Sequence, residues 1–216
     1  MVWYLSQKVE NSQHTSEILG GKPIELRDRQ RYADPAGVDP RTLSRDHASR
    51  EAGYRMDPNS LPKKVLWRSR NPEPLEILPG FVVNERFMAL VEEFEPSVHQ
   101  FVPVELYRDK TGQPTAGHYW FVVCQRAETV DPDRTTLRWN EAGRFWSSRV
   151  RDMASGDWQD IPGAEIVYSR KLAGGRHIWV DPTVLTHADK LCSDEFAQAA
   201  READFRGLAI TKRQAV

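Results

Sequence analysis

The spacing of hydrophobic and polar residues predicts several short strands along the chain. Residues 1–7 (MVWYLSQ) and 63–69 (KKVLWRS) group large apolar side chains without helical spacing. Valines alternate within 98–107, and a polar turn leads into 118–125 (HYWFVVCQ), so these two segments predict an antiparallel hairpin. Further strands are predicted at 135–139, 144–148, 164–172, 177–180 and 208–211, with the first two forming a hairpin around NEAG.

Two segments carry the spacing of amphipathic helices. Asn84 is a good N-cap, and the apolar residues after it repeat at i, i+3, i+4 and i+7: Phe87, Leu90, Val91 and Phe94. Pro96 ends this helix. A second helix is predicted to begin after Ser193, with a narrow apolar face: Phe196, Ala199, Ala200 and Ala203. Gly207 follows it, as expected just beyond a helix C-terminus.

The two helical segments resemble each other. VVNERFMALVEEF (82–94) and KLCSDEFAQAARE (190–202) share a strand, a capping residue, an acid and a Phe three residues after the cap. We interpret them as two ordinary strand-to-helix junctions rather than as a repeat. Together the elements predict one α+β domain over 1–216, with mainly antiparallel sheet and two principal helices.

Charge is distributed unevenly over the N-terminal half. Residues 22–70 contain 12 basic and 7 acidic residues, whereas 71–105 contain 7 glutamates against Arg86 alone. Within the basic segment, residues 27–64 have four prolines and few large apolar residues, so we expect a long irregular N-terminal arm with one short helix near 42–52. The arm could pair with the acidic segment of the same chain. Nucleic-acid binding is less favoured, because acids interrupt the basic residues and few aromatic residues accompany them.

Composition places the chain among globular proteins that do not enter membranes. Hydrophobic residues make up 39% and charged residues 28%, and no apolar run approaches the roughly 20 residues that cross a bilayer. The first residues lack the pattern of a secretory signal, so we expect a cytoplasmic location. Cys124 and Cys192 lie in apolar surroundings and are expected to be buried thiols without a disulfide or a zinc ion.

Spacing offers little support for catalysis or metal binding. If Tyr107 pairs with His118 in the predicted hairpin, His99 lies opposite Arg126, and the two histidines are about 26 Å apart at roughly 3.3 Å per residue. That distance excludes a shared metal ion. Cys124 lies among apolar residues and is not expected to act as a nucleophile. Nucleophile-elbow, zinc-protease and phosphate-loop motifs are absent from the sequence, so we expect no enzyme, no catalytic residues, no metal and no cofactor.

Three segments carry a resemblance to a known family. They are FVVNERFMALVEEFEPSVHQFVPVEL (81–106), HYWFVVCQ (118–125) and KLCSDEFAQAAREADFRGLAI (190–210). With these segments the chain resembles the eleventh numbered immunity-protein family of bacterial polymorphic toxin systems, over about 81–211. The matching motif positions are Glu95, Pro96, His99, Gln100, Phe101, Pro103 and Val104, followed by Ser193, Phe196, Gly207 and Leu208.

The resemblance implies a protein that binds and neutralises a cognate toxin and so protects the producing cell. The toxin is expected to be encoded by a neighbouring gene. The resemblance implies no catalytic residues, and it implies that His99 and Gln100 satisfy backbone groups between helix and strand. The basic arm would suit an acidic face of the toxin, but we favour the acids on the polar face of the first helix as toxin contacts, because they suit a partner with a basic cleft: Glu85, Glu92 and Glu93. Two alternatives stay open. One is a small enzyme that assembles histidines from His99, His118, His177 and His187, and the other is a nucleic-acid-binding accessory protein that uses the arm.

Overall fold

The computed structural model describes most of the chain after residue 60 and parts of what precedes it. The described residues are 1–7, 15–18, 53, 55, 58, 61–68, 75–78, 80–109, 112–140, 145–151, 157–184 and 190–216. Most of the predicted arm (22–70), including the short helix expected near 42–52, therefore lies outside the described residues, as does His187.

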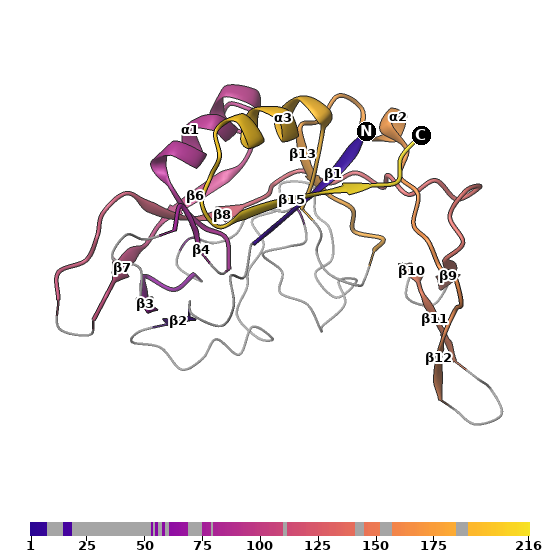
Figure 1. The fold of residues 1–216 in the computed structure, drawn as a ribbon, viewed down its shortest axis with the longest axis horizontal. Coiled ribbons are helices and arrows are strands. Elements are labelled where there is room, and N and C mark those ends of the chain that lie inside the picture. Colours follow the sequence, from indigo (N-terminus) through magenta and orange to yellow (C-terminus); the bar gives the residue numbers. More distant parts are fainter. Residues whose placement is uncertain are drawn as a thin grey trace.

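Two antiparallel four-stranded sheets form the centre of the fold (Figure 1). The first has the order β13-β14-β1-β15, from Ile178–Val180, Lys190–Cys192, Val2–Gln7 and Leu208–Arg213. The second has the order β4-β5-β8-β6, from Ile77–Leu78, Val82–Asn84, His118–Val122 and Gln100–Pro103. Helices α1 (Glu85–Phe94) and α3 (Asp194–Glu202) lie side by side over one side of these sheets.

Shorter sheets complete the architecture. A three-stranded sheet has the order β2-β3-β7, from Thr15–Ile18, Lys64–Arg68 and Glu105–Tyr107, and β3 runs parallel to β7. Two antiparallel ribbons extend away from the rest of the molecule in Figure 1. They pair β9 (Arg138–Asn140) with β10 (Phe145–Ser147), and β11 (Arg149–Arg151) with β12 (Trp158–Asp160). The predicted α+β class and the hairpin around 141–144 are confirmed.

Both principal helices begin where the capping residues predict. The Asn84 side chain accepts the N–H of Phe87 at 3.0 Å, and the Ser193 hydroxyl accepts the N–H of Phe196 at 3.2 Å. Each bond satisfies one of the backbone donors that the first turn of a helix leaves open. The Phe three residues after each cap is fully buried, and the two rings meet edge to face at 6.4 Å. These rings join both helices in one core cluster.

The likeness between the two helical segments extends to their topology. Strand β5 is flanked by β4 and β8, and α1 leads from β5 to β6, which also pairs with β8. Strand β14 is likewise flanked by β13 and β1, and α3 leads from β14 to β15, which also pairs with β1. The N-terminal strand β1 thus occupies the place that β8 has in the other sheet. The two segments therefore share the strand order of a whole four-stranded sheet, and not only the strand-to-helix junction that the sequence predicts.

The predicted register of the 98–125 hairpin is wrong by three residues. Pro103 pairs with Tyr119, so His99 lies opposite Val123 rather than Arg126. The predicted strand divides after Pro103, because the residues that follow join the three-stranded sheet. There the N–H of Glu105 donates to the carbonyl of Lys63, and β7 pairs with β3. His99 and His118 are then about five residues apart along the ladder, or roughly 17 Å, which still excludes a shared ion.

The strand predicted over 164–172 is also wrong. Tyr168 forms isolated bridges to Val130 and Ala215, and the following residues form the short helix α2 (Arg170–Ala173). Gly174 ends this helix in the left-handed conformation, with φ at 63°. The helix turns the chain toward β13, so the Gly174-Gly175 turn predicted there ends a helix rather than joining two strands.

Among the glycines that the structure describes, Gly207 is expected to cause the largest loss of stability when it is substituted. It has a φ of +91°, and an added Cβ would lie 2.2 Å from the carbonyl oxygen of Ile77. Gly207→Ala is therefore expected to lower the free energy of unfolding by about 2 kcal/mol, measured by urea titration. Gly163→Ala is the matched control, because Gly163 has a φ of +65° with no neighbour within 4 Å. Equal losses in both variants would contradict the close approach between Gly207 and β4.

Candidate protein-binding surface

The outer face of α1 carries the three acids that the sequence predicts as toxin contacts. Glu85 and Glu93 are exposed, and Glu92 is half-buried. They lie within one side of the helix, and seven to eight residues separate Glu85 from the other two, which is about 11 Å along the axis. The opposite side buries Phe87 and Val91. The structure thus brings the predicted acids to one solvent-facing surface.

Local contacts hold two of these acids in place. An oxygen of Glu85 lies 3.4 Å from the hydroxyl of Tyr119, at the N-terminal end of the helix, where a carboxylate is favoured. Glu92 accepts the N–H of Ser97 at 2.8 Å and so fixes the turn that follows the helix. Neither contact covers the outward side of the helix.

Helix α3 adds acids that the sequence analysis did not include. Glu195 and Glu202 are exposed, and the exposed Gln198 donates to Glu202 at 2.8 Å. Helix α3 packs beside α1 (Figure 1), so these acids add negative charge next to that of α1. The shared plan of cap and acid in the two segments was the signal that could have found them.

The arginines of the two helices are exposed, and each contacts other groups of the same chain. Each helix carries a single arginine, Arg86 in α1 and Arg201 in α3. Arg86 donates to Glu76 at 2.8 Å and lies over the ring of Phe205 at 4.7 Å. Arg201 lies over the ring of Trp3 at 3.8 Å. The two helices together hold six acids, of which Asp194 pairs with the N-terminal amine, against these two arginines, so the outer layer has a negative charge. We call it the acidic helix layer (outer side of 85–94 and 194–202).

The central motif after α1 forms a buried polar network. The Glu95 carboxylate accepts the N–H of His177 at 2.7 Å and of Ile178 at 3.2 Å, and lies 2.5 Å from Nε2 of His99. Nδ1 of His99 accepts the N–H of Cys124 at 3.1 Å. His99 therefore satisfies a backbone group, as the resemblance implies, and Glu95 ties the end of α1 to the start of β13. The network is structural and lies beneath the surface.

Hydrogen bonding decides the protonation of Glu95. Burial raises the pKa of its carboxyl, but hydrogen bonds from His99 and from the N–H of His177 outweigh burial and hold the pKa below its ordinary value of 4.5. The carboxylate is consequently charged at neutral pH and accepts all of its donors.

The remaining candidate nucleophiles and bases of the described chain are poorly suited to catalysis. Burial raises the pKa of the Cys124 thiol to about 11, and it raises the pKa of Cys192 further. Neither cysteine forms a disulfide, as predicted. Burial lowers the pKa of His118, whose Nδ1 lies 3.1 Å from the carbonyl of Ala116. Protonated thiols of this kind are inert.

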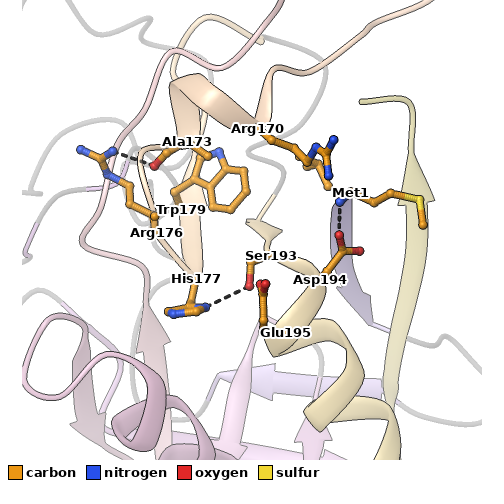
Figure 2. A pocket seen from close by; sticks show the side chains of 11 residues that line it. Met1, Arg170, Ala173, Arg176, His177, Trp179, Ser193, Asp194 and Glu195 are labelled. Atoms are coloured by element: carbon orange, nitrogen blue, oxygen red, sulfur yellow. Dashed lines mark hydrogen bonds and ion pairs between the residues drawn. The ribbon is translucent and has the colours of Figure 1, made fainter. Parts of the chain in front are cut away.

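A pocket of about 250 Å³ lies where α2, α3 and β13 meet (Figure 2). In Figure 2 His177 and Ser193 point toward one another, with Nδ1 of His177 3.0 Å from the Ser193 hydroxyl, and Glu195 lies beside them. This distance is that of a nucleophile and its base. The same hydroxyl caps α3, however, which accounts for its position.

The acids of this pocket lack the properties of a general acid. Its own backbone N–H and the Ser193 hydroxyl lower the pKa of Glu195. Burial raises the pKa of Asp194, but the N-terminal amine and the indole of Trp3 outweigh it and lower the pKa overall. A general acid at neutral pH requires a raised pKa. The pocket therefore lends no weight to the enzyme alternative.

The described residues form neither a metal-ligand cluster nor a membrane-spanning helix. Among the described residues, no group of three or more His, Cys, Asp or Glu side chains is arranged to hold a metal ion. Within the same part of the chain, no helix is both long enough and apolar enough to span a bilayer.

Comparison with known proteins identifies the family. Residues 25–215 match the immunity protein family Imm11. No match is found among curated proteins. The matched range includes the motif at 95–104 and the α3 segment, and it also reaches into the basic segment that the resemblance left out. Since the match spans most of the chain, the protein belongs to the Imm11 immunity protein family.

Proposed function

We propose that this chain protects the cell that produces it by binding and neutralising a cognate toxin. Its membership of an immunity protein family carries this proposal. The protein acts by occluding its partner rather than by catalysis, and it does so in the cytoplasm, before the toxin reaches its target. The toxin is expected to be the product of a neighbouring gene in a polymorphic toxin system.

We further propose that the acidic helix layer meets the toxin. Glu85, Glu92 and Glu93 supply the contact predicted from the sequence, and α3 enlarges it. A face with more acids than arginines, on which both arginines already contact groups of the same chain, suits a basic surface on the other protein. Enzymes that act on nucleic acids or nucleotides have such basic clefts, so we expect a toxin of this class.

An excess of negative charge over two adjacent helices also favours rapid association. Long-range attraction between oppositely charged surfaces raises association rate constants by about 10- to 1,000-fold at low ionic strength. Speed matters to an immunity protein, because the toxin must be bound before it acts. The acidic helix layer therefore serves both encounter and occlusion.

Co-expression tests the proposed function. The neighbouring gene product, expressed alone in a sensitive host, is expected to stop growth, and co-expression of this chain is expected to restore it. A catalytically inactive toxin variant serves as the control for expression burden. A neighbouring product that is harmless alone, or that still kills in the presence of this chain, would overturn the proposal.

A further inference from the structure

The outer ribbon of the molecule has two strand edges of different character. β11 and β12 pair only with each other among the described strands, and Figure 1 shows them extending away from the body. The base of this extension is anchored, because the N–H of Trp146 donates to the carbonyl of Thr183 at 2.7 Å. The ribbon of β11 and β12 thus extends into solvent from a segment that is hydrogen-bonded to the body of the protein.

The pairing determines which backbone groups face outward. The N–H of Ile161 donates to the carbonyl of Ser148 at 2.7 Å, and Val150 pairs with Gln159. In an antiparallel ladder the residues that bond to one another alternate with residues whose N–H and C=O point away. Arg149 and Arg151 therefore point their backbone groups outward from β11, while Trp158 and Asp160 point theirs outward from β12.

A side chain closes the β11 edge at Arg149. The Ser147 hydroxyl accepts the N–H of Arg149 at 3.0 Å and donates to the carbonyl of the same residue at 2.8 Å. Both outward groups of Arg149 are thereby satisfied. Proteins block exposed strand edges in such ways to prevent unwanted pairing.

The β12 edge is open along the same stretch. Within the described part of the chain, the outward N–H and C=O groups of Trp158 and Asp160 have no backbone partner. The Asp160 side chain is 79% exposed, and it pairs with Arg149 across the ribbon rather than covering the edge. An open strand edge is a template for one additional strand.

The charge of β12 indicates what kind of strand fits. Asp160 lies in the strand and the exposed Asp157 precedes it. Antiparallel pairing with a second copy of this chain, in the register that sets Asp160 opposite its copy, would place like charges directly across from each other, which is destabilising. A strand with lysine or arginine residues would instead place opposite charges side by side.

We propose that the open edge of β12 accepts an extended basic strand of the cognate toxin by β-strand addition. This inference rests on the proposed function, because it takes the partner to be the toxin. It adds a backbone contact that is separate from the acidic helix layer. Main-chain bonds would fix the orientation of the partner, while the helix acids attract it.

Asp160→Pro tests this contact against a matched control, Asp160→Ala. Both variants lose the carboxylate and the Arg149 pair, but only proline also removes the outward N–H, and proline is tolerated at outward-facing edge positions. With a catalytically inactive form of the neighbouring gene product as the probe, Asp160→Pro is expected to raise the Kd about ten-fold above that of Asp160→Ala. Equal Kd values for the two variants would overturn the inference.

Amide hydrogen exchange of the unmodified protein supplies a second measurement that does not depend on how the variants fold. The amides of Trp158 and Asp160 are expected to exchange at least about ten-fold more slowly in the complex. Unchanged exchange at both residues, in a complex that forms, would overturn the strand addition while leaving the proposed function intact. A concentration-dependent dimer that Asp160→Pro abolishes would also overturn it, in favour of self-pairing. Lack of any complex with the wild-type chain would instead refute the proposed function.

Discussion

Replacing Glu95 with alanine is expected to lower the free energy of unfolding by about 4 kcal/mol. The substitution leaves the N–H groups of His177 and Ile178 and the ring of His99 without their acceptor. Glu95 is only 6% exposed, so water does not replace the lost carboxylate. Urea titration followed by tryptophan fluorescence measures the change. A loss below about 1 kcal/mol would show that the network is not a major tie between α1 and β13.

The matched variant Glu95→Gln separates charge from hydrogen bonding. Glutamine keeps one acceptor for the backbone N–H groups but removes the negative charge beside His99. It is expected to cost less than alanine, about 2 kcal/mol, because the hydrogen bonds to a charged acceptor are the stronger ones. A glutamine variant as unstable as the alanine variant would mean that the charge, rather than the acceptor, carries the contribution.

Acid is expected to weaken the wild-type protein more than the glutamine variant. The folded-state pKa of Glu95 lies below its ordinary value of 4.5, so the folded protein binds this proton less readily than the unfolded chain does. The contribution is therefore fully present above about pH 4.5 and is lost as the pH falls through the folded pKa. Unfolding free energies of both proteins between pH 6 and pH 3 measure the difference. A constant difference over this range would contradict a lowered pKa.

Reversing the charge of the three α1 acids is expected to weaken toxin binding about 100-fold. The variant Glu85→Lys, Glu92→Lys, Glu93→Lys replaces attraction by repulsion at the proposed contact. Most of the loss is expected in the association rate constant, and it is expected to shrink as salt rises from about 50 to 500 mM. Surface plasmon resonance against the inactive toxin at several salt concentrations measures both.

A second triple variant controls for total charge. Glu128, Asp133 and Glu165 are exposed and lie outside α1 and α3, so their replacement by lysine changes the net charge by the same amount. This control is expected to keep the Kd within about three-fold of wild type. Melting curves of both variants are needed, because Glu92 also accepts the N–H of Ser97. Equal weakening of binding in both variants would place the toxin contact elsewhere.

Features set by neighbouring residues could be predicted from the sequence. Asn84 and Ser193 cap their helices with their own side chains, and the apolar spacing after each cap determines which side is buried. The polar positions of α1 followed from the same spacing, so the outward position of Glu85 and Glu93 was predictable. These signals act within about one helical turn.

Features that depend on distant segments could not be predicted. β7 leaves the hairpin because β3, some 40 residues earlier, offers a parallel partner, and nothing within 98–107 encodes that choice. The donors to Glu95 come from His177 and Ile178, more than 80 residues away, so the burial of this acid was hidden in a sequence of several glutamates. Glu195 and Glu202 join the acidic helix layer because α3 packs beside α1.

Calorimetric titration of the full chain into the catalytically inactive neighbouring gene product measures toxin binding itself. We expect a complex with one copy of each protein and a Kd in the nanomolar range, about −12 kcal/mol, as protection against a toxin requires. Absence of heat and of a complex at tens of micromolar, with both proteins folded, would contradict the claim that this member of the Imm11 family acts by binding that toxin.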